Sequence, residues 1–270
     1  MKLLFLGDVV GRAGRDIVCE RLPGLRRDLG LDFVVVNGEN AAGGYGITAK
    51  ICNQFYAAGT DVITTGNHVW DQREIIAHIG AEKRLLRPCN FPAGTPGAGH
   101  GVFAATRGRK VLVAHVMCRL FMHPLGDPFA AVEAALAAHR LGGTVDAVVL
   151  DIHGEATSEK MAMGHFVDGR VSLAVGSHTH VPTADAQIFA GGTAYQSDAG
   201  MCGDYDSIIG FDKAMWLTRF TRQMPTPRIT AATGPATLCG VVVETDDASG
   251  LARVVAPLRL GGRLAEAHPD

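Results

Sequence analysis

The sequence predicts an α/β fold in which strands from both halves of the chain pack face to face, with helices on the outside. Two observations carry this prediction. Apolar, strand-like runs alternate with amphipathic stretches in residues 1–80, an order that favours a parallel sheet with right-handed crossovers. The final third instead contains short strand-like pieces and a hairpin formed by 238–245 and 251–260. The sequence shows no internal repeat or linker, so we expect one domain spanning residues 1–270.

The first part of the chain is expected to form three strand–helix pairs. Apolar runs indicate buried strands at 3–6, 33–36 and 62–65. Amphipathic patterns indicate helices at 13–29, 48–58 and 70–79. We expect Pro23 to interrupt the first of these helices, and Gly59 and Gly80 to end the other two.

The rest of the chain is expected to extend the same architecture. Further strands are indicated at 111–116, 147–150 and 171–175. Further helices are indicated at 129–139 and 213–220. A loop rich in glycine and proline spans 88–101, and we expect this loop to form part of the rim of the functional site.

The bulk composition argues against several classes of function. The chain has 25 basic and 27 acidic residues, and the resulting formal net charge of −2 gives no global field that would attract nucleic acid or anionic lipid. Apolar residues make up 47% and charged residues 19%, which indicates an ordinary globular protein. No apolar run approaches the roughly 18 residues that a membrane span requires, and the opening apolar run is too short for a signal-peptide core. We therefore expect a cytoplasmic protein.

The six cysteines lie far apart and include no C-x-x-C pair. This spacing does not form a disulfide framework in a chain of this length. It also argues against a thiolate zinc site. We expect the cysteines to behave as small buried hydrophobic residues in a reducing compartment.

Five polar clusters, each directly after an apolar run, carry the functional signal. They are Gly-Asp at 7–8, Gly-Glu-Asn at 38–40, Gly-Asn-His at 66–68, Asp-Ile-His at 151–153 and Gly-Ser-His-Thr-His at 176–180. The carboxyl ends of parallel strands meet at one edge of a sheet, so these side chains should converge on a common point. A mixed set of nitrogen and oxygen ligands without thiolate suits Mn, Fe or Zn better than Mg or Ca.

The histidines of these clusters are candidate metal ligands. His178 and His180 are two residues apart, so both rings can reach one site just past the end of a strand. The alternative is a pair of surface or capping histidines. His153 follows a separate strand, and its presence favours the metal site over that alternative.

The oxygen ligands in the clusters also have structural alternatives. Asp8 can ligate a metal or cap the helix that follows it, and Asn67 can offer its amide oxygen or serve as a turn residue. Glu39 is a poor core residue, and its two carboxylate oxygens can bridge two cations. Two divalent ions with Asp8, Glu39 and a bridging hydroxide would leave a charge of about +1, which should attract an anionic phosphate ester. His68 directly follows Asn67 and is the candidate general acid for the leaving group.

In this order the motifs resemble those of the calcineurin-like metallophosphoesterases. Gly-Asn-His is followed by Val69 instead of an acidic residue, Val10 takes the place of the histidine in the usual D-x-H motif, and Glu39 takes the place of the usual bridging aspartate. These departures are typical of the YmdB-type branch of that superfamily. The resemblance to this branch extends from Asp8 to about Gly210, and it also includes the segments 37–44, 66–71, 155–160, 178–185 and 198–201.

The resemblance implies a four-layer α/β/β/α sandwich with a binuclear centre of divalent or mixed-valence ions (Fe, Mn or Zn). It implies phosphodiesterase activity, notably on 2′,3′-cyclic nucleotides, through a metal-activated hydroxide with His68 as the catalytic acid. The metal ligands that it implies are Glu39 as the bridge, Asp8, Asn40 and His180 on one ion, and Asn67, His153 and His178 on the other. Asn40 would replace the ligand that is missing at Val10. The expected partners are a small-molecule phosphodiester or cyclic nucleotide, and RNA ends are a further candidate. No membrane partner is expected, and a homo-oligomer is left open.

Three other functions compete with this hypothesis. A phosphomonoesterase, such as a nucleotidase, could use the same site, and a non-catalytic regulator could bind a nucleotide there. Metal-dependent amidohydrolases also use an H-x-H pair, but they place it after their first strand, whereas here it follows residue 175. Tyr45, Tyr205 and Arg119 are weaker candidates for contacts with a base or a phosphate.

Overall fold

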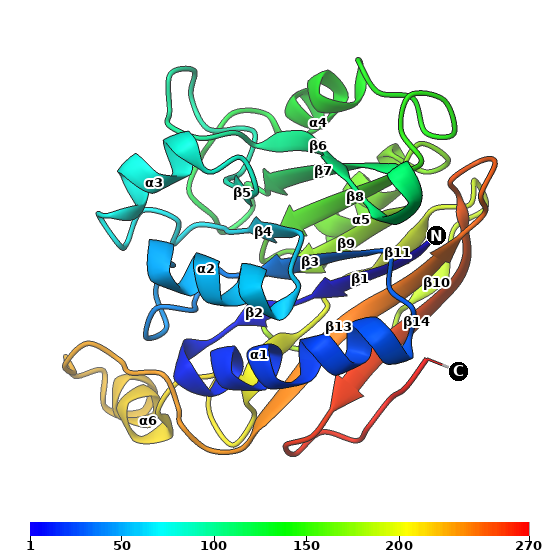
Figure 1. Ribbon diagram of the computed structural model, residues 1–270. Helices are drawn as coiled ribbons and strands as arrows, with labels where there is room; N and C mark the ends of the chain where they lie inside the picture. The colour runs from blue at the N-terminus through cyan, green and yellow to red at the C-terminus, as the bar shows by residue number, and fades with distance from the viewer. Residues whose placement is uncertain (270) are drawn as a thin grey trace.

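The computed structural model describes residues 1–269 and contains two β-sheets (Figure 1). The larger sheet consists of β1 (Lys2–Leu6), β2 (Asp8–Val9), β3 (Phe33–Asn37), β4 (Val62–Thr64), β5 (Leu85–Leu86), β12 (Met201–Asp204), β13 (Ala236–Thr245) and β14 (Ala252–Leu260). Its strand order is β2-β12-β13-β1-β3-β4-β5, with β14 beside β13. The pairs β1–β3, β3–β4 and β4–β5 are parallel, as the alternation of strands and helices predicts.

The smaller sheet consists of β6 (His100–Ala104), β7 (Lys110–Met117), β8 (Ala147–His153), β9 (Leu173–Ser177), β10 (Gln187–Ile188) and β11 (Ala194–Gln196). Its strand order is β10-β11-β9-β8-β7-β6. The helices are α1 (Gly11–Asp28), α2 (Ala49–Ala58), α3 (Ile75–Ala81), α4 (Pro128–Leu136), α5 (Thr157–Phe166) and α6 (Lys213–Arg222), with one short 3₁₀ helix at Thr106–Gly108. The predicted C-terminal hairpin is confirmed, because β13 and β14 pair antiparallel.

Side chains alternate between two faces along each central strand, and this alternation builds the layers. In β1, Leu4 and Leu6 pack in a core shared with α1 and α2. Leu3 and Phe5 face the other way, into a core shared with the smaller sheet. The outer face of β7 packs in a third core that includes residues of α4 and α5. These three cores confirm the predicted four-layer α/β/β/α sandwich, with α1 and α2 on one outside and α4 and α5 on the other.

Some of the predicted element boundaries were wrong. Pro23 does not interrupt α1, because Leu22 and Leu25 on its buried face hold the helix against the core, and packing outweighs local propensity. The third helix is shorter than predicted and runs from Ile75 to Ala81, so that Gly80 lies inside it. The helix α5 was not predicted, and the strand β6 begins inside the segment that was predicted as a loop.

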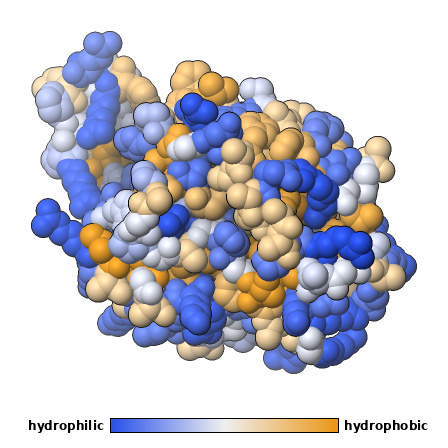
Figure 2. Space-filling view, turned by 90° about the horizontal axis from the view of Figure 1, so that it is seen from above, coloured by the Kyte–Doolittle hydropathy of each residue, from blue (hydrophilic) through white to orange (hydrophobic). Residues whose placement is uncertain are grey.

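The thiols and the surface agree with the composition. All six cysteines are free, which confirms that they form no disulfide framework. None of the helices within residues 1–269 has both the length and the apolar composition that crossing a bilayer requires. On the face shown in Figure 2, apolar residues lie in small groups among hydrophilic ones.

Candidate metal centre

The predicted site residues lie directly at the ends of the strands that carry them. They are Asp8 at the start of β2, Glu39 and Asn40 after β3, Asn67 and His68 after β4, His153 at the end of β8, and His178 and His180 after β9. Two of these strands, β8 and β9, belong to the smaller sheet, and the others belong to the larger sheet. The site is therefore assembled between the two sheets.

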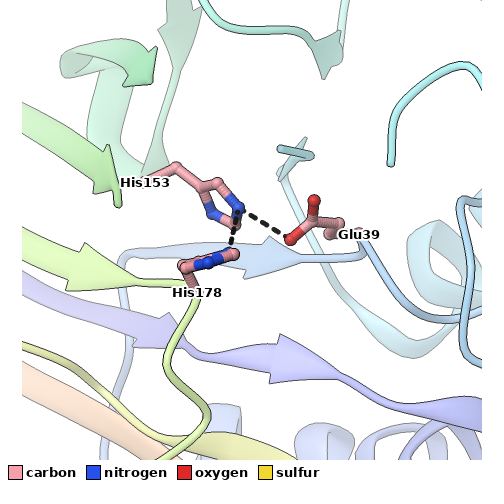
Figure 3. A group of neighbouring side chains, drawn as sticks. All are labelled: Glu39, His153 and His178. Atoms are coloured by element: carbon pink, nitrogen blue, oxygen red, sulfur yellow. Dashed lines mark hydrogen bonds and ion pairs between the residues drawn. The ribbon is translucent and has the colours of Figure 1, made fainter. Parts of the chain in front are cut away.

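Four of the predicted ligands meet at Nε2 of His153 (Figure 3). Oε2 of Glu39 lies 2.8 Å from this nitrogen, and Oδ1 of Asn67 lies 3.1 Å from it. Nδ1 of His178 lies 3.2 Å from the same atom. Figure 3 shows Glu39, His153 and His178 pointing toward one another from separate strand ends. Fold topology thus brings together side chains that are far apart in the sequence.

A second pair of predicted ligands, Asn40 and His180, lies on the same cavity as Glu39. Nε2 of His180 is 3.1 Å from Oδ1 of Asn40. The carbonyl oxygen of Ile209, 2.7 Å from Nδ1 of His180, can only accept a hydrogen bond, so Nδ1 carries the hydrogen. The amide of Asn40 donates to the carbonyl of Gly44 at 2.9 Å. Both contacts direct the lone-pair atoms, Nε2 and Oδ1, toward each other.

Asp8 is the remaining member of the predicted ligand set. Its side chain is fully buried, and its Oδ2 accepts a hydrogen bond from the backbone N–H of His178 at 3.0 Å. Its Oδ1 is buried without a hydrogen-bond partner among the described residues and lies 4.0 Å from Nδ1 of His153. A buried carboxylate oxygen without a partner is costly, so this atom fits a role as a cation ligand.

The charged groups of the cluster shift one another's pKa values. Burial alone would raise the pKa of Glu39, but the adjacent ring of His153 holds that pKa well below its usual range. Burial alone would lower the pKa of His153, but Glu39 and then Asp8 raise it to about 9. Burial and the neighbouring His153 lower the pKa of His178 to about 3. In the absence of a cation, His153 therefore holds a proton, and a metal ion would have to displace it.

The donor set fits a divalent transition metal. Ligand atoms about 2.1 Å from a tetrahedral ion stand roughly 3.4 Å apart, and the separations around Nε2 of His153 are 2.8, 3.1 and 3.2 Å. Imidazole nitrogens with carboxylate and amide oxygens suit Mn, Fe or Zn. In the structure Glu39, Asn67 and His178 lie around Nε2 of His153, and Asn40 lies beside His180.

A glycine makes this close approach sterically feasible. A Cβ atom on Gly66 would collide with Nε2 of His153 and with the carboxylate of Glu39. Residue 66 immediately precedes Asn67. The turn that positions the amide ligand must therefore also leave room for the side chains of His153 and Glu39. The glycine of the Gly-Asn-His motif is therefore required by packing at the site itself.

The H-x-H segment has a strained backbone. His178 has φ +100° and His180 has φ +65°, in a region that non-glycine residues seldom adopt. A fully buried ion pair beneath the segment supports it: Nζ of Lys160 lies 2.9 Å from Oδ2 of Asp198. The same carboxylate oxygen accepts hydrogen bonds from the N–H and the hydroxyl of Thr179 at 3.0 and 2.8 Å. Tertiary contacts thus hold the two histidines in place.

A polar network lies beneath His153. Oγ of Ser177 is 2.9 Å from Nδ1 of His153 and donates to Oδ1 of Asp151 at 2.6 Å. Oδ2 of Asp151 accepts from the hydroxyl of Thr64 at 2.6 Å and from the amide of Asn37 at 3.1 Å. All five residues are fully buried. The network connects strands of both sheets directly below the site.

His68 lines the cavity, and among the described residues its ring is hydrogen-bonded to Asp71, not to the His153 cluster. Its backbone N–H donates to Oε1 of Glu39 at 2.8 Å, which places the residue beside the bridging candidate. Nδ1 of its ring lies 3.0 Å from Oδ2 of Asp71, and the side chain is 31% exposed. The ring is therefore oriented by Asp71 while it remains accessible to a bound ligand.

A cavity of about 360 Å³ opens above the site and includes Glu39, Asn40, His68, His178 and His180 in its lining. No residue of 88–101 lines it or the smaller adjoining cavity at Asn67, and Phe121, Met122 and His123 lie at the latter instead. The prediction that the 88–101 loop forms the rim was therefore wrong. Asn90 shows the reason, because its side chain hydrogen-bonds to the carbonyls of Met117 and Gly126 and ties the loop to neighbouring backbone.

The weaker candidates have mixed outcomes. Tyr45 lines the cavity, whereas the hydroxyl of Tyr205 donates to the backbone of His180 at 3.0 Å and neither Tyr205 nor Arg119 lines the cavity. One wall of the cavity was not predicted from the sequence: the region of α6 contributes it, with Phe211, Trp216 and Arg219. The only signal for that wall was the helical pattern at 213–220, which carries no site motif.

This chain is similar to known proteins over most of its length. Residues 4–258 match the family described as YmdB-like protein. The chain belongs to the YmdB-like family. It is 45% identical over 247 residues to the 2′,3′-cyclic-nucleotide 2′-phosphodiesterase of Bacillus subtilis (strain 168), and the match covers 92% of each chain.

Two solved structures are similar to this member of the YmdB-like family. A protein from Thermus thermophilus has a TM-score of 0.90 at 40% identity, covering 97% of this chain and 100% of that one. A phosphatase from Mycoplasma pneumoniae has a TM-score of 0.90 at 32% identity, covering 100% of this chain and 95% of that one. These findings confirm the resemblance to the YmdB-type branch of the calcineurin-like metallophosphoesterases.

Proposed function

We propose that this protein is a metal-dependent phosphodiesterase that hydrolyses 2′,3′-cyclic nucleotides. The observation that carries the proposal is the convergence of Glu39, Asn67 and His178 on Nε2 of His153, at the floor of an open cavity. The Bacillus subtilis relative, described as a 2′,3′-cyclic-nucleotide 2′-phosphodiesterase, supports a phosphoric ester hydrolase and suggests the substrate.

Two metal ions bound here would lower the pKa of a water molecule toward 7 and offset the negative charge of the phosphoryl group. We assign one ion to Asn67, His153 and His178, the other to Asp8, Asn40 and His180, and the bridge to Glu39. Burial raises the pKa of the Asp8 carboxyl well above its usual range, so a bound cation would have to keep Asp8 ionised beside Glu39 for the two to supply the protein's negative charge at this point. The neutral amides and imidazoles add ligands without adding charge, which leaves the site attractive to an anion.

We assign His68 as the general acid. Asp71 holds Nδ1 of the ring at 3.0 Å, so Nε2 is the nitrogen that is free to face a ligand. In the proposed reaction a water molecule that has lost one proton to solvent bonds through its oxygen to phosphorus, and the bond from phosphorus to the ribose 2′ oxygen breaks. The imidazolium form of His68, with Nδ1–H held by Asp71, gives its Nε2 proton to that oxygen. The product then carries its phosphate on the 3′ oxygen.

The leaving group provides the test of this assignment. We expect His68→Ala in the Mn-reconstituted enzyme to lower kcat on 2′,3′-cyclic AMP by roughly 100-fold, within the usual range for a general acid. The loss on bis(p-nitrophenyl) phosphate should be much smaller, because nitrophenolate leaves without a proton. His139→Ala is the matched control, since His139 lines a different cavity together with Glu133 and Arg170.

Each alternative function has its own outcome in the same assay. Turnover of a phosphomonoester without turnover of either diester would replace the proposal with a phosphomonoesterase. No turnover of any substrate, with two metal ions bound per chain, would favour a non-catalytic nucleotide-binding regulator. Equal losses on both diesters in His68→Ala would refute the role of His68 as the acid while leaving the diesterase in place.

A further inference from the structure

We infer that the aromatic side of the active-site cavity is a binding subsite for the nucleobase of the substrate. This inference rests on the proposed function and specifies how the enzyme would distinguish a nucleotide from other phosphodiesters. The cavity volume of about 360 Å³ falls in the range of roughly 300 to 1,000 Å³ that is typical of small-molecule sites.

The cavity has two chemically distinct sides. One side carries the candidate ligands and His68, and the other is formed by Tyr45, Ile209, Phe211, Trp216, Arg219 and Ile229. Phosphate chemistry requires only the first side. The second side is apolar and aromatic, with one guanidinium group, and nothing in the proposed reaction uses it.

Tyr45 connects the aromatic side of the cavity, through Phe211, to His68 on the other side. Their ring centres are 5.4 Å apart, and Tyr45 also contacts the ring of His68 edge-on at 5.3 Å. The guanidinium of Arg228 lies 4.4 Å from the centre of the Tyr45 ring. An aromatic wall therefore begins directly at the proposed general acid, where the sugar of a bound nucleotide would lie.

Trp216 contributes an aromatic plane and an unused donor. It lies in α6, which stands apart from both helix layers in Figure 1, and it lines the cavity. Its indole Nε1 is buried and has no hydrogen-bond partner among the described residues, which is uncommon for a buried polar group. A nucleobase offers a flat face for stacking on the indole ring. An aliphatic ligand has no such face.

A contact with the backbone also fixes the position of the aromatic side of the cavity relative to the side that carries the metal ligands. Nδ1 of His180, a proposed metal ligand, donates to the carbonyl of Ile209 at 2.7 Å, and the side chain of Ile209 lines the aromatic side. Phe211 follows two residues later and packs in a small core with Val10, Met201 and Ile229. The position of the aromatic wall relative to the metal ligands is therefore set by the fold.

The test compares a nucleotide with a base-free diester in Trp216→Ala, Trp216→Phe and the control Leu217→Ala. Leu217 lies on the same helix, is 53% exposed and does not line the cavity. Stacking on an aromatic side chain contributes enough affinity that we expect Trp216→Ala to raise KM for 2′,3′-cyclic AMP roughly tenfold with kcat retained. The kcat/KM for glycerol 1,2-cyclic phosphate should not change. Trp216→Phe should recover most of the loss, and Leu217→Ala should match wild type.

Equal effects of Trp216→Ala on both substrates, or no effect on either, would overturn the subsite. A second measurement separates this failure from failure of the proposed function. The chain contains two tryptophans, so in a Trp70→Phe background the fluorescence reports Trp216 alone, and we expect adenosine to quench it without turnover. Quenching by adenosine in an inactive protein would support the subsite and refute the diesterase. An active diesterase without quenching and without a change in KM would refute only the subsite.

Discussion

Oγ of Ser177 lies 2.9 Å from Nδ1 of His153, and this contact decides which nitrogen of His153 is available to a metal ion. The hydroxyl of Ser177 gives its single hydrogen to Oδ1 of Asp151 at 2.6 Å. Oγ of Ser177 can then only accept from the ring, so Nδ1 keeps its hydrogen, and Nε2, which lies 2.8 Å from Oε2 of Glu39, is the nitrogen that loses its proton when a metal ion binds. Hydrogen bonds of this kind, from the far nitrogen of a ligating histidine, commonly fix its tautomer.

We expect Ser177→Ala to weaken Mn binding by about 10- to 100-fold, the usual effect of removing such a supporting contact. Isothermal titration of the metal-free protein measures this affinity directly. Ser172→Ala is the matched control, because Ser172 is equally buried and hydrogen-bonded to Gly250 just before β9, five positions away from Ser177. Unchanged Mn affinity in Ser177→Ala would refute the supporting role of Ser177.

We expect Gly66→Ala to abolish metal binding while the protein still folds. The added methyl group would displace His153 or Glu39, since both lie where the Cβ atom would be. Metal content by elemental analysis and the thermal midpoint with and without Mn are the measurements, and the stabilisation by Mn should disappear in the variant.

Gly80→Ala provides the control for this prediction. Gly80 lies in α3 with open space around its Cβ position, so alanine should be neutral or stabilising there by up to about 1 kcal/mol. Metal binding should be retained in Gly80→Ala. If Gly66→Ala also retained metal binding, the prediction would be wrong, because the crowding at residue 66 would then be relieved without displacing His153 or Glu39.

The buried pair of Lys160 and Asp198 should make stability depend on pH. Burial alone would raise the pKa of Asp198, but Lys160 and the hydrogen bonds to the carboxylate lower it below its usual value. The unfolded chain, with a carboxyl pKa of about 3.9, then binds the proton more readily than the folded protein does. The stabilisation by Asp198 is therefore fully present above about pH 4 and is lost as the pH falls through its lower folded-state pKa.

We expect Asp198→Asn to lower the free energy of unfolding at pH 7 by about 3 kcal/mol, because it leaves the Lys160 ammonium buried without its partner. Urea denaturation at pH 7 and at a series of values below 4 measures this difference, which should shrink as the pH falls. Glu133→Gln removes the exposed pair with Arg170 and should have little effect. Equal losses in the two variants would contradict the prediction.

Local sequence patterns predicted most of the fold and of the candidate ligands. The strand β3 and the start of the Glu39–Asn40 turn were identifiable because a short apolar run ends at a polar cluster. The end of α2 was equally identifiable, since Gly59 adopts φ +106° as a left-handed helix cap. Pro23 was misjudged because local propensity predicts a break where the packing of Leu22 and Leu25 keeps the helix continuous.

The sequence by itself determined the layered architecture and the set of candidate ligands, because apolar runs and the polar clusters that follow them are local signals. Only the tertiary structure decided how those ligands are supported and what faces them. The contacts of His153 with Ser177 and of Lys160 with Asp198 join separate strands and helices, and no spacing in the chain encodes such pairs. The position of Trp216 beside the site likewise depends on where the fold places α6, since its helical pattern is the same wherever the helix packs.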